Sequence, residues 1–229
     1  MQTIYKTSGA AAEYGELALN IYNGCPHKCF YCSVPKTIRK PKDEFHGDIT
    51  PRKNIVEETE HYIKSNKLTG KLVHLCFSCD PYPTGFDSIA TRNIIKLLKD
   101  SGNHVQILTK GSGVRDFDLL DENDWYGVTL DGTEDIDTAM PTRVDDLVAA
   151  HQAGIKTWVS FEPVVYPEVV LKEIKLVAPF VDMVKIGKLN HFPLSVDWKA
   201  FGNKAESLCK QLGLTYCIKD TLRAEMLAE

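Results

Sequence analysis

The sequence lacks any long apolar run, and this excludes several classes of protein. None of its hydrophobic stretches approaches the roughly 20 residues that a helix needs to cross a lipid bilayer. The first residues, Met-Gln-Thr-Ile-Tyr-Lys-Thr-Ser, do not contain the apolar core of a signal peptide. Internal repeats and low-complexity tracts are also missing. We therefore expect a globular cytoplasmic protein with no membrane partner.

An excess of positive charge is missing too. The formal net charge of −4 argues against a protein whose whole surface binds nucleic acid. One local basic segment remains, at Lys36, Arg39, Lys40 and Lys42. This segment is either a contact for the phosphates of a nucleic-acid substrate or a solvated loop without a partner.

The cysteine count does not suit a disulfide framework. Seven is an odd number, and Cys25, Cys29 and Cys32 lie close together in the chain. Free thiols in a reducing compartment are the better interpretation. Because no fourth cysteine lies nearby, the three thiols can ligate three corners of an iron–sulfur cube and leave one iron open for a ligand. A zinc knuckle is the alternative, although zinc sites usually take four ligands.

Strand-like and helical runs alternate along most of the chain. Strands are predicted at residues 17–22, 71–77, 103–109, 125–130, 155–161, 182–186 and 214–218. Helices are predicted at residues 52–66, 88–101, 115–123, 142–153, 167–178 and 198–212. Such βα units imply parallel strands joined by right-handed crossovers. The fold class is therefore α/β, and we favour a partial (β/α)6 TIM-type barrel with a short additional C-terminal strand. An open doubly wound sheet is the alternative.

We expect one domain over residues 1–229, with its core at about residues 16–218. Residues 1–15 are predicted to form an arm or an edge segment. Residues 33–50 are predicted to form an extended loop after the cysteines. In either architecture the reactive residues lie at the carboxyl ends of the strands.

The cysteine spacing, with Tyr31 before the last cysteine, resembles the radical S-adenosylmethionine (SAM) superfamily. Further segments resemble its spore photoproduct lyase-like, or DNA repair photolyase-like, branch: 20–32, 78–83, 107–111, 115–120, 128–131, 151–156 and 161–163. The resemblance implies a 4Fe–4S cluster on Cys25, Cys29 and Cys32, with SAM bound at the open iron. It also implies reductive cleavage of SAM to a 5′-deoxyadenosyl radical that abstracts hydrogen from a substrate. The implied electron donor is a flavodoxin or a ferredoxin.

The resemblance also implies roles for residues at the ends of the early strands. Ser78 and Asp80 would bind the amino group of SAM, Lys110 its carboxylate, and Thr129 and Asp131 its ribose. Each has a simpler alternative, because Asp-Pro and Asp-Gly also begin turns and a lysine can be a solvated rim charge.

Later strand ends supply the remaining cofactor candidates. Ser160 and Glu162 lie at the end of the fifth predicted strand, where a carboxylate is costly without a partner, so a cofactor or substrate contact is favoured. Gly187 would let the backbone approach the adenine, or it is a turn glycine.

Cys79 is the candidate catalytic residue. Spore photoproduct lyases use a cysteine in this neighbourhood as a hydrogen-atom donor, although the wider group tends to have Ser or Thr at this position. Cys76 is a second possibility for that role. Together with Cys209 and Cys217, these thiols could instead hold an auxiliary cluster or pack as small apolar side chains.

A nucleic-acid base or lesion is the expected substrate of this lyase-like enzyme. Modification of a peptide or a small metabolite is the alternative, and a tRNA or nucleotide substrate is a third. From a different class, a non-catalytic iron–sulfur protein for electron transfer or sensing would also need these cysteines.

Overall fold

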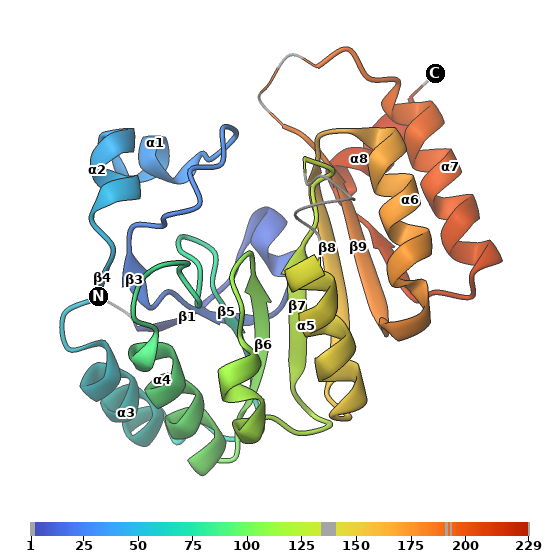
Figure 1. The fold of residues 1–229 in the computed structure, drawn as a ribbon. Coiled ribbons are helices and arrows are strands. Elements are labelled where there is room, and N and C mark those ends of the chain that lie inside the picture. The colour runs from blue at the N-terminus through green and yellow to red at the C-terminus, as the bar shows by residue number, and fades with distance from the viewer. Residues whose placement is uncertain (1–2, 134–140, 191, 193, 229) are drawn as a thin grey trace. The chain divides into compact units, whose positions relative to one another are not determined.

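The computed structural model describes residues 3–133, 141–190, 192 and 194–228. It divides the chain into two compact units, Met1–Trp125 and Tyr126–Glu229. Each unit is built from strands covered by helices, as Figure 1 shows. Of the described helices, none combines the length and the apolar character that crossing a membrane requires.

Four strands of the first unit lie in the order β1-β2-β5-β6. Their bounds are Ile4–Lys6, Leu17–Leu19, Leu72–Leu75 and His104–Thr109. The edge strand β1 runs antiparallel to β2, whereas β2, β5 and β6 are parallel. Val73 and Ile107 are fully buried, as expected for parallel strands that are covered on both faces.

The helices of this unit follow the expected periodicity. Helix α3 (Ile55–Asn66) and helix α4 (Ile89–Asp100) lie side by side in Figure 1, and α4 also packs against β6. Ile94, Ile95 and Leu98 form the buried face of α4. Gly102 adopts φ +73 just after this helix, the left-handed conformation that commonly ends a helix.

The prediction of an extended loop over residues 33–50 is wrong. The segment contains helices α1 (Val34–Ile38) and α2 (Lys42–Gly47), followed by strand β4 (Thr50–Pro51). Strand β4 pairs with β3 (Tyr22–Asn23), so the predicted strand over residues 17–22 is divided into β2 and β3. Helices this short show too few turns for a hydrophobic period to be recognised.

Two further segments differ from the expected helices. Residues Val114–Leu119 form the 3-10 helix η2 instead of the α-helix predicted at 115–123. The buried Asp116 in this segment accepts hydrogen bonds from Arg92 and Tyr82. The predictions omitted the 3-10 helix η1 (Gly9–Glu13).

The second unit repeats the pattern with strand order β7-β8-β9-β10. The bounds of these strands are Trp125–Thr129, Lys156–Val164, Met183–Lys188 and Tyr216–Ile218. Strand β9 is parallel to both β8 and β10, and β10 is the predicted short additional strand. Trp158 is fully buried against Gly127, where a Cβ atom would lie 2.2 Å from its indole nitrogen.

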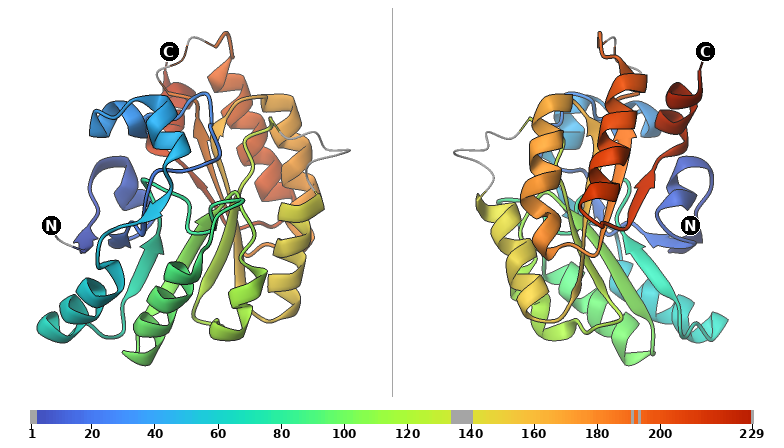
Figure 2. Two further views of the ribbon diagram at one scale, coloured as in Figure 1. Left: turned by 60° about the vertical axis from the view of Figure 1, so that its left-hand side comes forward. Right: turned by 90° about the vertical axis from the view of Figure 1, so that its right-hand side faces the viewer.

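Helices α5, α6, α7 and α8 complete this unit. Their bounds are Pro141–Gln152, Pro167–Val177, Trp198–Gln211 and Asp220–Leu227, and the 3-10 helix η3 (Ala178–Phe180) follows α6. Figure 2 shows α6 and α7 side by side along one face of the strands. The predictions omitted α8, which packs against α7 and β9.

Candidate functional site

The loop that carries the three cysteines begins against helix α2. Gly24 has φ +84, and a Cβ atom there would lie 2.5 Å from the carbonyl oxygens of both Phe45 and Asp48. The N–H group of Cys25 donates to the carbonyl oxygen of Phe45 at 3.1 Å. The ring nitrogen Nδ1 of His46 lies 2.7 Å from the carbonyl oxygen of Cys25. Helix α2 therefore fixes the position of the first cysteine.

The three thiols have the properties of ligands for an iron–sulfur cluster. All are free and partly accessible. Burial raises the pKa of the Cys25 thiol to about 12 and also raises the pKa of Cys32, which disfavours their ionised forms. Ligation by these thiolates would therefore depend on the positive charge of bound metal ions. In the described part of the chain, the sulfur atoms of these three cysteines do not all lie within 4.8 Å of one another. This argues against a single zinc ion, whereas a cube takes one thiolate per iron, so the donor set fits a 4Fe–4S cluster.

Asp80 joins the ends of two strands to the cysteine loop. Its Oδ1 atom accepts from the N–H of Tyr82 at 2.8 Å and from the hydroxyl of Thr109 at 2.5 Å. Its Oδ2 atom accepts from the N–H of Lys110 at 2.7 Å and lies 3.0 Å from Nε2 of His27. The contact with His27 has the distance of an ion pair but not the geometry of a hydrogen bond. The predictions missed His27, because only the tertiary fold brings it to Asp80.

Lys110 and Tyr31 lie together, as two candidates for the same cofactor should. The ammonium group of Lys110 lies 5.4 Å from the centroid of the Tyr31 ring, within the range of a cation–π interaction. At the next residue, Gly111, a Cβ atom would lie 1.9 Å from the carbonyl oxygen of Tyr82. Glycine is therefore required immediately after Lys110.

Ser78 is held by two residues that the predictions did not include. The Oδ1 atom of Asn20 accepts from the N–H groups of Phe77 and Ser78, each at 2.8 Å. The guanidinium group of Arg52 donates to the hydroxyl of Ser78 at 3.2 Å. Arg52 and Ser78 line a cavity of about 260 Å³ beside the cysteine loop, and Gly24 is also in its wall.

Cys76 and Cys79 form a buried pair of thiols after β5. The sulfur of Cys79 accepts from the N–H of Tyr22 at 3.4 Å. Burial and a hydrogen bond shared with Cys79 raise the pKa of Cys76. Burial acts on Cys79 in the same direction, but hydrogen bonds from Cys76 and from backbone N–H groups outweigh it and lower the pKa of Cys79. A hydrogen bond therefore links the two buried thiols.

The two remaining cysteines lie in the second unit. Cys209 of α7 is fully buried, and burial raises its pKa to about 11. Its surroundings fit a small apolar side chain. Cys217 of β10 is partly accessible.

Glu162, Gly187 and the previously unrecognised Lys219 lie together at the end of the strands in the second unit. The ammonium group of Lys219 lies 3.3 Å from Oε2 of Glu162. The side chain of Lys219 is 1% exposed, and that of Glu162 is 19% exposed. A Cβ atom on Gly187 would lie 2.8 Å from the Cδ atom of Glu162. Gly187 lies within β9 and not in a turn, and it leaves room for the carboxylate.

The position of Lys219 in the chain was the signal that sequence reasoning could have used. It directly follows β10, as Glu162 lies near the end of β8. Its backbone N–H donates to the carbonyl oxygen of Ile186 at 2.9 Å, which continues the pairing of β10 with β9.

In the described part of the chain, the three remaining candidates make contacts within the fold. These candidates are Ser160, Thr129 and Asp131. Ser160 is fully buried opposite Lys185 in the pairing of β8 with β9. The carbonyl oxygen of Thr129 accepts from Arg143 at 3.0 Å. Oδ1 of the buried Asp131 accepts from the N–H of Thr133 at 2.9 Å, before which Gly132 adopts φ +81. Asp131 and Gly132 therefore form a turn in this structure.

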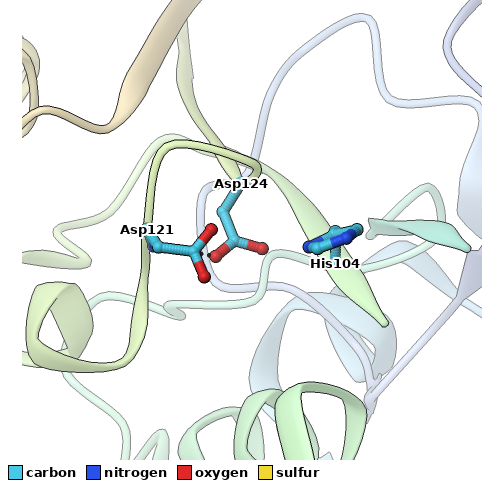
Figure 3. A group of neighbouring side chains, drawn as sticks. All are labelled: His104, Asp121 and Asp124. Atoms are coloured by element: carbon cyan, nitrogen blue, oxygen red, sulfur yellow. Dashed lines mark hydrogen bonds between the residues drawn. The ribbon is translucent and has the colours of Figure 1, made fainter. Parts of the chain in front are cut away.

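Figure 3 shows a further group of potential metal ligands, His104, Asp121 and Asp124, which begins at the amino end of β6. The ammonium group of Lys99 lies 2.7 Å from Asp121 and 2.5 Å from Asp124. Asp124 also accepts from the backbone N–H of Val105 at 2.8 Å. Because a lysine already balances these carboxylates, we assign the group a structural role.

Comparison with known proteins gives the family. The model of the Radical SAM superfamily matches residues 19–180. Uncharacterized proteins of Mycobacterium bovis and Mycobacterium tuberculosis are 30% identical over 123 residues, which is 51% of this chain. The chain covers 36% of the length of these curated relatives.

Among solved structures, Streptococcus suis SuiB bound to precursor peptide SuiA matches with a TM-score of 0.67. The match covers 91% of this chain and 50% of the SuiB chain at 12% identity. At this identity the likeness shows the fold alone, and it confirms the predicted α/β class of the partial TIM-barrel type. Since the family model spans well over half of the sequence, the chain belongs to the radical SAM superfamily.

Proposed function

We propose that this chain is a radical SAM enzyme that begins its reaction by hydrogen abstraction. The observation that carries the proposal is the loop with three free thiols, Cys25, Cys29 and Cys32, which would hold a 4Fe–4S cluster. When cluster and SAM are bound, they supply the superfamily's chemistry, which is one-electron cleavage of SAM to methionine and a 5′-deoxyadenosyl radical. The residues of the first unit then have to hold SAM and exclude water.

In the first unit we assign SAM contacts to Ser78, Lys110 and Tyr31. Lys110 suits the carboxylate of SAM, because its ammonium group lies over Tyr31 of the cysteine loop. The hydroxyl of Ser78 suits the amino group. The two oxygens of Asp80 already have four close polar contacts, which is about the capacity of a carboxylate. Asp80 thus acts by positioning the loops that carry the other residues.

In the second unit we assign ribose and adenine contacts to Thr129, Asp131, Ser160, Glu162 and Gly187. Glu162 is the strongest of these candidates. Lys219 compensates its charge, while the 19% exposure of its side chain leaves an edge that can accept a hydrogen bond from a ligand.

For the substrate, we propose a nucleic-acid base or lesion and a spore photoproduct lyase-like reaction. The support is the sequence resemblance in and beyond the cysteine motif. Cys79 would donate a hydrogen atom to the substrate radical, so that its S–H bond breaks as a C–H bond forms. An electron and a proton from the reducing system would restore the thiol. Peptide modification is the second candidate, since SuiB, which shares the fold, was solved with its precursor peptide.

The test is anaerobic reconstitution with iron and sulfide, reduction with dithionite and addition of SAM. We expect iron binding and release of 5′-deoxyadenosine, and we expect Cys25→Ala to abolish both. Cys217→Ala is the matched control, because this thiol lies in β10 and should leave both unchanged. A fully loaded cluster that does not cleave SAM would instead favour the electron-transfer or sensor alternative.

A further inference from the structure

The surface next to the cysteine loop is both basic and apolar. Residues 25–42 contain four lysines and one arginine and no acidic residue, although the whole chain has a net charge of −4. Phe30 lies between two of the cysteines and is 47% exposed, and Ile38 at the end of α1 is 49% exposed. We call the exposed residues Lys28, Phe30, Lys36, Ile38 and Arg39 the α1 surface.

The basic residues of this segment fall into two groups. Lys40 pairs with Glu44 at 3.2 Å, and Lys42 donates to the carbonyl oxygen of Phe30 at 3.4 Å. Lys42 thus connects helix α2 to the cysteine loop, and the charge of Lys40 is already balanced by an acidic residue of α2. In contrast, Lys36 and Arg39 are exposed and form no ion pair within the described part of the chain. Their charges are available to a partner.

We propose that the α1 surface is the docking site of an acidic electron-carrier protein of the flavodoxin or ferredoxin class. The inference rests on the proposed function, because reductive cleavage of SAM needs an electron from outside the chain. The carrier loses one electron, the cluster gains it, and no atoms are exchanged. An apolar centre flanked by charges is the composition of a transient interface, and opposite charges speed the encounter of the two proteins.

The same surface fits a protein better than a nucleic acid. Phosphate binding needs lysine and arginine but gains nothing from an exposed Ile38. The exposed acidic residues Asp43 and Glu44 of the adjacent helix α2 do not distinguish the two partners, because they would repel an acidic carrier and a phosphate backbone alike. The exposed apolar side chains of Phe30 and Ile38 make the distinction in favour of a protein.

The experiment compares two electron sources for the same reconstituted enzyme. In the charge-reversal variant Lys36→Glu/Arg39→Glu, we expect the KM for a reduced acidic flavodoxin to rise roughly tenfold or more. SAM cleavage driven by dithionite, which needs no docking, should stay within about twofold of wild type. Binding of oxidised flavodoxin to the cluster-free chain, measured by calorimetry at low salt, should weaken in parallel and give a readout independent of activity.

The matched control is Lys67→Glu/Lys96→Glu, which makes the same change in net charge at two exposed positions, one just after α3 and one on α4. We expect the control to leave both electron sources unchanged. The neutral variant Ile38→Ser should weaken flavodoxin binding without altering its dependence on salt.

Unchanged flavodoxin binding and KM in the charge-reversal variant overturn the docking proposal. So does loss of retention on single-stranded DNA or tRNA with flavodoxin unaffected, because the α1 surface would then be a nucleic-acid contact. If wild type loaded with cluster fails to cleave SAM even with dithionite, the proposed function itself is refuted, and the docking proposal with it.

Discussion

At the scale of single residues, Glu162 is the side chain whose environment is most demanding. A carboxylate that is mostly removed from water needs a compensating charge, and Lys219 provides it at 3.3 Å. The lysine itself is buried, so each partner depends on the other. The buried lysine holds the carboxylate of Glu162 in one place, as binding of a ligand would require.

Replacement of Lys219 by methionine should therefore destabilise the chain by about 3–5 kcal/mol, because it leaves the carboxylate of Glu162 without its partner. Urea denaturation measures this loss. The double variant Lys219→Met/Glu162→Gln should recover part of it. A loss as large in the double variant as in the single one would show that the ion pair is not the cause.

Gly187→Ala should separate binding from stability. The added Cβ atom would lie 2.8 Å from Cδ of Glu162, and the end of a flexible side chain can move away at modest cost. Because the displaced carboxylate can stay near Lys219, we expect a much smaller loss of stability than in Lys219→Met, together with at least about tenfold weaker SAM binding, since the oriented hydrogen bond is lost. Equilibrium dialysis with the reconstituted protein measures the affinity. Unchanged affinity would remove Glu162 from the SAM contacts.

Single residues could be predicted from the sequence where their chemistry fixes the residue type and the local spacing. The cysteines could be found because cluster ligation requires one residue type at a fixed spacing. His27 and Arg52 could not be found, because their partners Asp80 and Ser78 reach them only through tertiary contacts. Lys219 differs, because its place directly after a predicted strand was a usable signal. The conformation of Asp131-Gly132 was predictable as a turn, since the Asp-Gly pair favours it locally.

At the scale of elements, the regular βα units were predictable and the short ones were not. Buried strands such as β6 and glycines at helix ends such as Gly102 give strong local signals. Helix α8 has only eight residues, and Lys219 at its start makes no side-chain cap. Its position depends on packing against α7 instead.

Ion pairs fix the irregular segment after β6 to helix α4, and they predict an acid-dependent stability. Hydrogen bonds from Arg92 lower the pKa of Asp118, and hydrogen bonds from Lys99 lower that of Asp121. Carboxylates with lowered pKa values contribute stability that is fully present above their ordinary pKa of about 4 and is lost as the pH falls through the lowered values. We expect urea midpoints to fall below about pH 4.

Arg92→Met should flatten this acid dependence, because Asp118 then returns toward its ordinary pKa. Urea titrations at pH 7 and near pH 3 on both proteins give the comparison. If the urea midpoint falls equally between pH 7 and pH 3 in the two proteins, the ion pair of Arg92 with Asp118 does not cause the acid dependence.

At the scale of the whole molecule, the three cysteines belong to the first unit but lie in a loop outside the strands of its apolar core. The buried strands β5 and β6 form the core of the first unit without contributing a cysteine ligand. The loop is held from outside, by α2 and by Asp80.

Removal of the cluster should therefore leave the secondary structure intact but loosen the cysteine loop. We expect unchanged far-UV circular dichroism and faster trypsin cleavage at exposed Lys28 and Lys36 after treatment with chelator and oxidant. Mass spectrometry of the fragments measures the sites. Collapse of the circular dichroism signal would show that the fold itself depends on the metal.

The shared contacts of Asp80 have a consequence for divergence among relatives of this chain. One carboxylate serves His27 of the cysteine loop as well as Thr109 and the backbone of Lys110 at the end of β6, which are two segments far apart in the chain. A substitution at position 80 would leave several polar groups unsatisfied at once, so no single second change repairs it. Positions 27, 80 and 109 should therefore covary, and a lineage that changes one of them should have replaced the set.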